Sequence, residues 1–120
     1  MDNMENVDSK TTVAIDVLYT IVRYTTLGVE GVSRLELIPG SVNRILTGNV
    51  VDGVKIVIEK DLVYIDLFVV LNTGINVRDV SHKIQADVTR AIAEMVGMEV
   101  ARVNIHIEDF HYNAIAEAKI

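Results

Sequence analysis

One run of the sequence, residues 62–108, constrains the fold more than any other. It opens with an apolar stretch, Leu62–Leu71, and closes with Val100–Glu108, where apolar and polar residues alternate as in a half-buried strand. Between them, Val77–Val96 has apolar residues at steps of three and four, the spacing of an amphipathic helix. A strand, a helix and a strand joined by short links predict a right-handed crossover and a parallel pairing of the two strands.

A further strand is predicted just before this run. Val54–Glu59 is separated from the strand at 62–71 by two residues, so a tight hairpin fixes the register by counting. Ile56 is then opposite Ile65 on the apolar face. The opposite face of each strand is mixed, so helices are expected on one side of the sheet only.

These patterns together predict the fold class. We expect an α+β protein, a two-layer sandwich in which a mixed β-sheet has two main helices packed on one face. A β-α-β crossover lies near its C-terminus. A doubly wound fold would need strands that are apolar on both faces, and the strand patterns do not fit that requirement.

The other predicted helix lies near the N-terminus and runs from about Val17 to Leu27. Residues 10–14 are compatible with a short edge strand before it, and Asp16 with the helix N-cap. Gly28 fits the left-handed conformation that often ends a helix. The apolar stripe of this helix is expected to consist of Val17, Leu18, Ile21, Val22 and Thr25. The apolar stripe of the helix predicted at Val77–Val96 is expected to include Met95.

The segment 33–53 is the least regular part of the sequence. An extended piece is expected up to residue 38, followed by a turn at Pro39-Gly40 and a short helix capped by Ser41. Residues 48–53 read as a loop. We divide the whole chain into a flexible N-terminal segment (residues 1–9), a single domain (10–112) and a C-terminal tail (113–120).

Composition and charge exclude several classes of function. The net charge of −6 and the scattered basic residues argue against nucleic-acid and anionic-membrane binding. The absence of cysteine excludes thiolate chemistry, and the three histidines are not spaced to converge on a metal, so no metal or cofactor is expected. The N-terminus has no signal-peptide pattern, and no apolar stretch is long enough to span a membrane. We therefore expect a cytoplasmic protein that meets a membrane only through a partner.

The sheet face away from the helices is the candidate binding surface. It combines an apolar centre containing two aromatic residues with a polar rim, as many protein interfaces do. Two interpretations stay open: the face binds a protein, or it is covered by the N-terminal arm, the 33–53 segment or the C-terminal tail. Asp66 and His106 would form an ion pair if their strands are adjacent. The predicted face comprises Val57, Tyr64, Asp66, Phe68, Val70, Arg102, Asn104 and His106.

The loop between the first long strand and the second helix is an alternative site. Thr73, Gly74 and Asn76 are small, they precede a helix N-terminus that offers free amides, and Arg78 follows them. No glycine-rich phosphate motif is present, and glycine and asparagine are also what an ordinary turn and helix cap select. We therefore favour a turn over a site for an anion or small molecule. No nucleophile–base set is identifiable either, so an enzyme is not expected.

Three stretches resemble the alkaline shock protein family of bacterial envelope-stress-response proteins. They are VEGV at 29–32, VYIDLFVV at 63–70 and INVRDVSHKIQADVTRAIAEMVGMEVARVNIHIED at 75–109, and the similarity extends over most of residues 10–112. The helix-to-strand run that ends in VNIHIED is the most specific part. The sequence differs from many relatives at 33–53 and in its short tail.

The resemblance implies a small cytoplasmic bacterial protein without known catalytic residues. It also implies a link to cell-envelope or alkaline stress, self-assembly, and attachment near the membrane through a separate membrane protein. The predicted function is therefore that of a non-enzymatic binding or assembly protein, acting as a homo-oligomer or with a membrane-anchored partner. The alternative is a small-molecule or anion sensor that uses the 72–78 loop.

Overall fold

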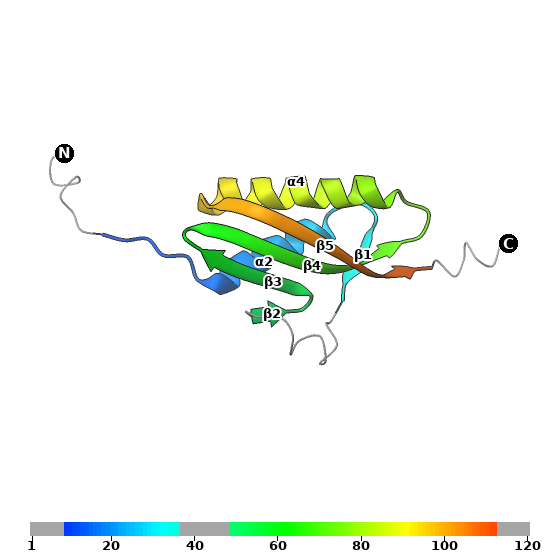
Figure 1. Ribbon diagram of the computed structural model, residues 1–120, viewed down its shortest axis with the longest axis horizontal. Helices are drawn as coiled ribbons and strands as arrows, with labels where there is room; N and C mark the ends of the chain where they lie inside the picture. Colours follow the sequence, from blue (N-terminus) through cyan, green and yellow to red (C-terminus); the bar gives the residue numbers. More distant parts are fainter. Residues whose placement is uncertain (1–8, 37–48, 113–120) are drawn as a thin grey trace.

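The computed structural model of the protein describes residues 9–36 and 49–112, with the side chains of 49–51 left out of the description (Figure 1). Two helices and five strands make up this part of the chain. In chain order they are α2 (Ile15–Leu27), β1 (Val32–Leu35), β2 (Asn49–Val51), β3 (Val54–Glu59), β4 (Leu62–Asn72), α4 (Val77–Val96) and β5 (Glu99–His111).

The strand β4 is the centre of a mixed five-stranded sheet. On one side it pairs antiparallel with β3 along its first part and with β1 near its end, where Val32 is opposite Leu71. On the other side it pairs parallel with β5 along its whole length, and β2 extends the sheet beyond β3. The predicted parallel pairing across the helical crossover is therefore confirmed.

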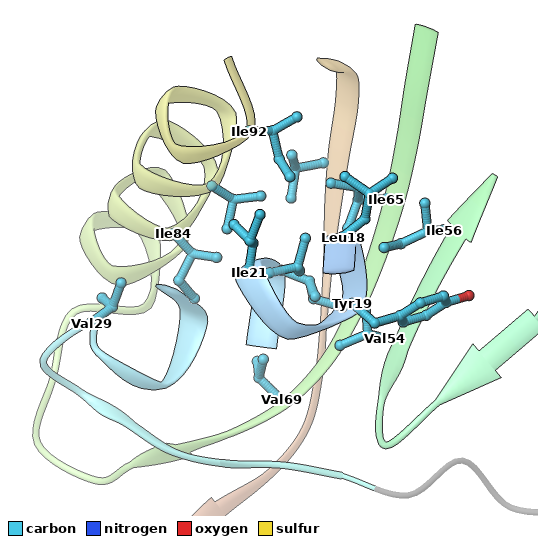
Figure 2. Close-up of a cluster of buried hydrophobic side chains, with 14 of the residues drawn as sticks. Leu18, Tyr19, Ile21, Val29, Val54, Ile56, Ile65, Val69, Ile84 and Ile92 are labelled. Atoms are coloured by element: carbon cyan, nitrogen blue, oxygen red, sulfur yellow. The ribbon is translucent and has the colours of Figure 1, made fainter. Parts of the chain in front are cut away.

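Both helices cover the same face of this sheet. Alternate residues of β4 point into one core together with Leu18 of α2 and with Ile84 and Ile92 of α4, as the close-up in Figure 2 shows. This arrangement confirms the predicted two-layer α+β sandwich. The core-facing residues of β4 are all fully buried: Val63, Ile65, Leu67, Val69 and Leu71.

The hairpin between β3 and β4 and the boundaries of α4 agree with the prediction. Ile56 pairs with Ile65, and the two turn residues, Lys60 and Asp61, have φ of 51° and 68°. Positive φ at both central positions gives the mirror-image turn that suits the twist of two adjacent strands. The helix α4 begins after Asn76 and ends at Gly97, whose φ of 70° is left-handed.

The N-terminal part differs from the prediction. Residues 10–14 are exposed and lie in no strand, so the predicted edge strand is wrong. The helix α2 starts at Ile15 with Ala14 at its N-cap, so the predicted cap at Asp16 is wrong. Asp16 lies in the first helical turn instead, where a carboxylate still interacts favourably with the helix dipole.

The predicted apolar stripes were also too wide. Val17 is 44 % exposed and Met95 is 66 % exposed, because each lies at the border of its stripe and turns away from the sheet. Thr25 is half-buried, whereas Thr26 is fully buried and donates its hydroxyl to the Val22 carbonyl oxygen at 2.7 Å. The helix therefore meets the sheet through a face rotated slightly from the predicted one.

Two turns differ from the prediction. The helix α2 ends at Gly28 as predicted, but the φ of Gly28 is −79°, which is right-handed. The left-handed glycine is Gly31 (φ 104°), where an added Cβ would lie 2.9 Å from a methyl carbon of Val80. The predicted loop at 48–53 contains β2 and the turn Asp52-Gly53, with φ of 48° and 81°. The predicted helix at Ser41 and the turn at Pro39-Gly40 lie outside the described residues.

Candidate functional site

The sheet face opposite the helices carries all eight residues that the sequence predicted for it. They come from the alternate positions of β4, from the neighbouring positions of β5, and from one residue of β3. We call this set the outer face: Val57, Tyr64, Asp66, Phe68, Val70, Arg102, Asn104 and His106. The adjacency of β3, β4 and β5 places these side chains next to one another.

Asp66 is the centre of a polar cluster on the outer face. Its Oδ1 accepts a hydrogen bond from Asn104 Nδ2 at 3.1 Å and lies 2.9 Å from His106 Nε2. The imidazole of His106 also stacks on Phe68, with ring centroids 4.6 Å apart and an angle of 11° between the planes. The carboxylate and the aromatic ring therefore hold His106 in one orientation, as the predicted Asp66–His106 pairing requires.

Tyr64 and Arg102 form a second contact on the same face. Tyr64 of β4 is directly opposite Arg102 of β5, and the guanidinium carbon lies 5.1 Å from the centroid of the tyrosine ring. This is a cation–π geometry, which favours a fixed arginine over a freely rotating one. Val57 of β3 flanks Tyr64 on the other side.

The outer face is unevenly accessible. Phe68 is 6 % exposed and Val70 is fully buried, whereas Val57, Tyr64 and Asp66 are half-buried and the three β5 residues are exposed. The accessible apolar surface is therefore the Val57–Tyr64 end, and Phe68 is less available than the sequence predicted. The N-terminal arm, the 33–53 segment and the C-terminal tail were considered as segments that cover the outer face. Residues 1–8, 37–48 and 113–120 of these segments lie outside the described residues.

The 72–78 loop is built as a turn and a helix cap. Thr73 donates its backbone N–H to the His111 carbonyl oxygen at 3.2 Å, and Gly74 takes a left-handed φ of 86°. The side chain of Asn76 accepts the backbone N–H of Asp79 at 3.0 Å, which satisfies one of the free amides at the start of α4. The role of this loop as an anion site stays a prediction.

A groove between α4 and β5 was not predicted from the sequence. Its volume is about 670 Å³, and Arg78 lies in it. Gln85 of α4 also lines it and donates its side-chain amide to the Val103 carbonyl oxygen at 3.1 Å. The polar residues of α4 that line the groove can be recognised in the sequence as the polar face of the helix. The groove itself also requires β5 to be an edge strand. Its lining comprises Val77, Arg78, Ser81, His82, Gln85, Asn104, Ile105 and His106.

Neither a metal cluster nor a membrane-spanning helix is found in the part of the chain that the structure describes. No group of three or more histidine, cysteine, aspartate or glutamate side chains converges within residues 9–36 and 49–112. Within the same ranges, neither helix combines the length and the hydropathy that crossing a bilayer requires.

Comparison with known sequences gives a family match over most of the chain. The model of the alkaline shock protein family, described as having a cell envelope-related function, matches residues 3–112. Two proteins of Bacillus subtilis (strain 168) are similar to the chain. "Uncharacterized protein YqhY" is 24 % identical over 119 residues, which cover 98 % of this chain and 88 % of that protein. "Uncharacterized protein YloU" is 26 % identical over 82 residues, which cover 68 % of each.

Comparison with solved structures supports the fold. The MamM-CTD matches with a TM-score of 0.50 at 10 % identity, covering 80 % of this chain and 99 % of that chain. A MamM CTD variant matches with the same TM-score at 12 % identity, covering 79 % and 96 %. At such low identity the likeness extends to the fold alone.

Proposed function

Since this chain belongs to the alkaline shock protein family, whose function is cell envelope-related, we propose that it is a non-enzymatic binding and assembly protein. It acts in the envelope stress response by docking a protein partner on its outer face. The partner is a second copy of the chain or the cytoplasmic part of a membrane-anchored protein. The protein itself works in the cytoplasm and reaches the membrane only through that partner.

The observation that carries this proposal is the organisation of the outer face. A half-buried tyrosine lies under an arginine at 5.1 Å, and a histidine is held between Asp66 and Phe68. Tyrosine and arginine are the residue types that most often dominate binding energy at protein interfaces. Side chains that are already ordered lose little conformational entropy on binding, which favours affinity.

The charge of the chain favours a protein partner over other surfaces. A net charge of −6 repels nucleic acids and anionic lipid headgroups. Arg102 and His106 are nevertheless exposed on the outer face, beside the half-buried Tyr64. A partner segment with an apolar side chain next to an acidic one would match this arrangement.

The test uses a matched pair of single variants. Tyr64→Ala removes the aromatic ring of the cation–π pair on the outer face and keeps Arg102, whereas Tyr24→Ala removes a similar ring on α2, which has the Arg23 guanidinium carbon 5.8 Å from its centroid. We expect loss of self-association or of capture of a membrane-anchored partner only with the first variant. If both variants retain the same oligomer size and the same bound partners, the outer face has no such role.

A further inference from the structure

The strand β5 is an edge strand with one side open. It has thirteen residues, Glu99–His111, of which eleven pair with β4, and no other strand of the described chain lies against its outer side. An unpaired strand edge presents backbone donors and acceptors that readily pair with another strand. The edge of β5 is therefore a surface that the fold leaves available.

The middle of this edge coincides with the groove beside α4. The residues that β5 contributes to the groove are Asn104, Ile105 and His106, so the groove is centred on Ile105. Gln85 reaches the Val103 carbonyl oxygen from the same groove, which places that acceptor on the groove side of the strand. A carbonyl oxygen has two lone pairs, so one bond from Gln85 leaves a second bond available.

The sequence of β5 is complementary to itself around Ile105. If two copies pair antiparallel with Ile105 opposite Ile105, Arg102 of each copy is opposite Glu108 of the other. Val103 is then opposite Ile107, and Asn104 is opposite His106. Arg102 of each copy therefore faces a carboxylate of the other copy. Val103 and Ile105 face apolar side chains.

The neighbouring registers lack this complementarity. A pairing centred on Asn104 would place Arg102 opposite His106 and Glu99 opposite Asp109. A pairing centred on His106 would place Val103 opposite Asp109. In the pairing with β4 the register skips Ala101 and Glu108, so the regular segment runs from Arg102 to Ile107 and Glu108 is the first residue beyond it. The Arg102–Glu108 contacts would therefore form at the two ends of the paired segment.

We propose that the β5 edge is a homodimer interface, in which β5 of one protomer pairs antiparallel with β5 of its partner about a two-fold axis at Ile105. The two sheets then join into one, and the two grooves meet at the axis. The two outer faces become one continuous surface that offers two copies of the docking site. This inference rests on the assembly role in the proposed function: it assigns the second copy to the β5 edge and leaves the outer face, with Tyr64, to the membrane-anchored partner.

The test exchanges the charges of the self-complementary pair in the full chain. Arg102→Glu and Glu108→Arg each place like charges opposite one another at two symmetric positions. Each should weaken the dimer roughly tenfold, as measured by sedimentation equilibrium. The double variant Arg102→Glu/Glu108→Arg restores opposite charges and should recover the dimer. Glu94→Arg, the same change at an exposed position of α4, is the control and should have no effect.

A second measurement gives the register directly and does not depend on the charges. The chain contains no cysteine, so Asn104→Cys and His106→Cys introduce single thiols. Because these positions are opposite one another across the axis, oxidation of a mixture should give mostly the mixed disulfide, which mass spectrometry distinguishes from the two homodimers. Circular dichroism melts of every variant verify folding.

Three results would overturn the proposal: a wild-type chain that stays monomeric, single charge changes without effect on the dimer, and a double variant that does not recover. These experiments distinguish failure of the β5 interface from failure of the proposed function. The double charge variant has no arginine at position 102 over the Tyr64 ring, so it should dimerise but no longer capture the partner of the outer face. A chain that captures its partner while remaining monomeric would refute the β5 interface alone.

Discussion

The two faces of β4 show how one strand separates stability from surface chemistry. The inner face consists of aliphatic residues without measurable exposure, packed against both helices. The outer face consists of Tyr64, Asp66, Phe68 and Val70, and its contacts are a hydrogen-bonded carboxylate, a stacked imidazole and a cation–π pair. The inner face is expected to stabilise the fold through burial, and the outer face to contribute less stability and more specificity.

Truncating an inner residue should have the strongest effect on stability. Ile65 is fully buried in the centre of the core, so Ile65→Ala should lower the free energy of unfolding by about 2–5 kcal/mol. Tyr64→Ala, one residue away on the outer face, should lower it by clearly less, because Tyr64 is only half-buried. Urea unfolding followed by circular dichroism measures both. Similar losses for the two variants would contradict the division between the faces.

Removing the carboxylate of the outer face should have an intermediate effect. Asp66→Ala leaves Asn104 and His106 without their shared acceptor and should cost about 1 kcal/mol, since the cluster is partly exposed to water. Asp87→Ala on α4, which removes contacts of 3.3 Å to Lys83 and 3.2 Å to Arg90, is the matched control. Proton NMR of the His106 ring should show that it becomes mobile in the first variant only. An unchanged ring signal would mean that Asp66 does not orient the histidine.

A tyrosine of the helical layer should make stability depend on alkaline pH. Burial raises the pKa of the Tyr19 hydroxyl, and the negative charge of Asp16 adds to this effect, while a backbone hydrogen bond at Ile56 opposes it. The unfolded chain then loses this proton at lower pH than the folded one. Stability should therefore fall as the pH rises above about 10, the ordinary tyrosine pKa. Figure 2 shows the Tyr19 ring beside Val54, within the core cluster.

Tyr19→Phe is the test of this pH dependence. The variant lacks the ionisable hydroxyl, so its free energy of unfolding should fall less steeply between neutral and alkaline pH than that of the wild type. Denaturant titrations at several pH values measure the two slopes. Parallel slopes would show that Tyr19 ionises equally in the folded and unfolded chains.

The C-terminal half of the fold could be predicted closely because its signals are local. The period of α4, the cap at Asn76, the glycine at 97 and the two-residue hairpin turn each fix a boundary without reference to the rest of the chain. The register of β4 with β3 then determines which residues share the outer face. The Asp66–His106 contact followed from that register and from the parallel crossover.

The remaining errors concern properties that depend on the whole fold. Val17 and Met95 have the right spacing for the core, but only the angle at which each helix meets the sheet decides their exposure. The burial of Val70 accompanies its position between two strands, where it pairs with Arg34 of β1 and Asp109 of β5, and the groove beside α4 depends on the strand order. The strand β2 was missed because it has three residues, although Asp52-Gly53 is a strong hairpin signal.

The 72–78 loop should show the smallest effect, because its polar groups already have partners. Asn76 satisfies an amide of the first turn of α4, and Thr73 binds the end of β5. Inorganic phosphate, nucleotides and coenzyme A should therefore leave the melting temperature unchanged in a thermal-shift assay. A saturable shift that Gly74→Val abolishes would instead favour the sensor hypothesis. Gly31→Val is not a suitable control, since its Cβ would clash with Val80 and destabilise the fold directly. Gly97→Val is the matched control, because Gly97 is also left-handed, with open space around the added Cβ, at the other end of α4.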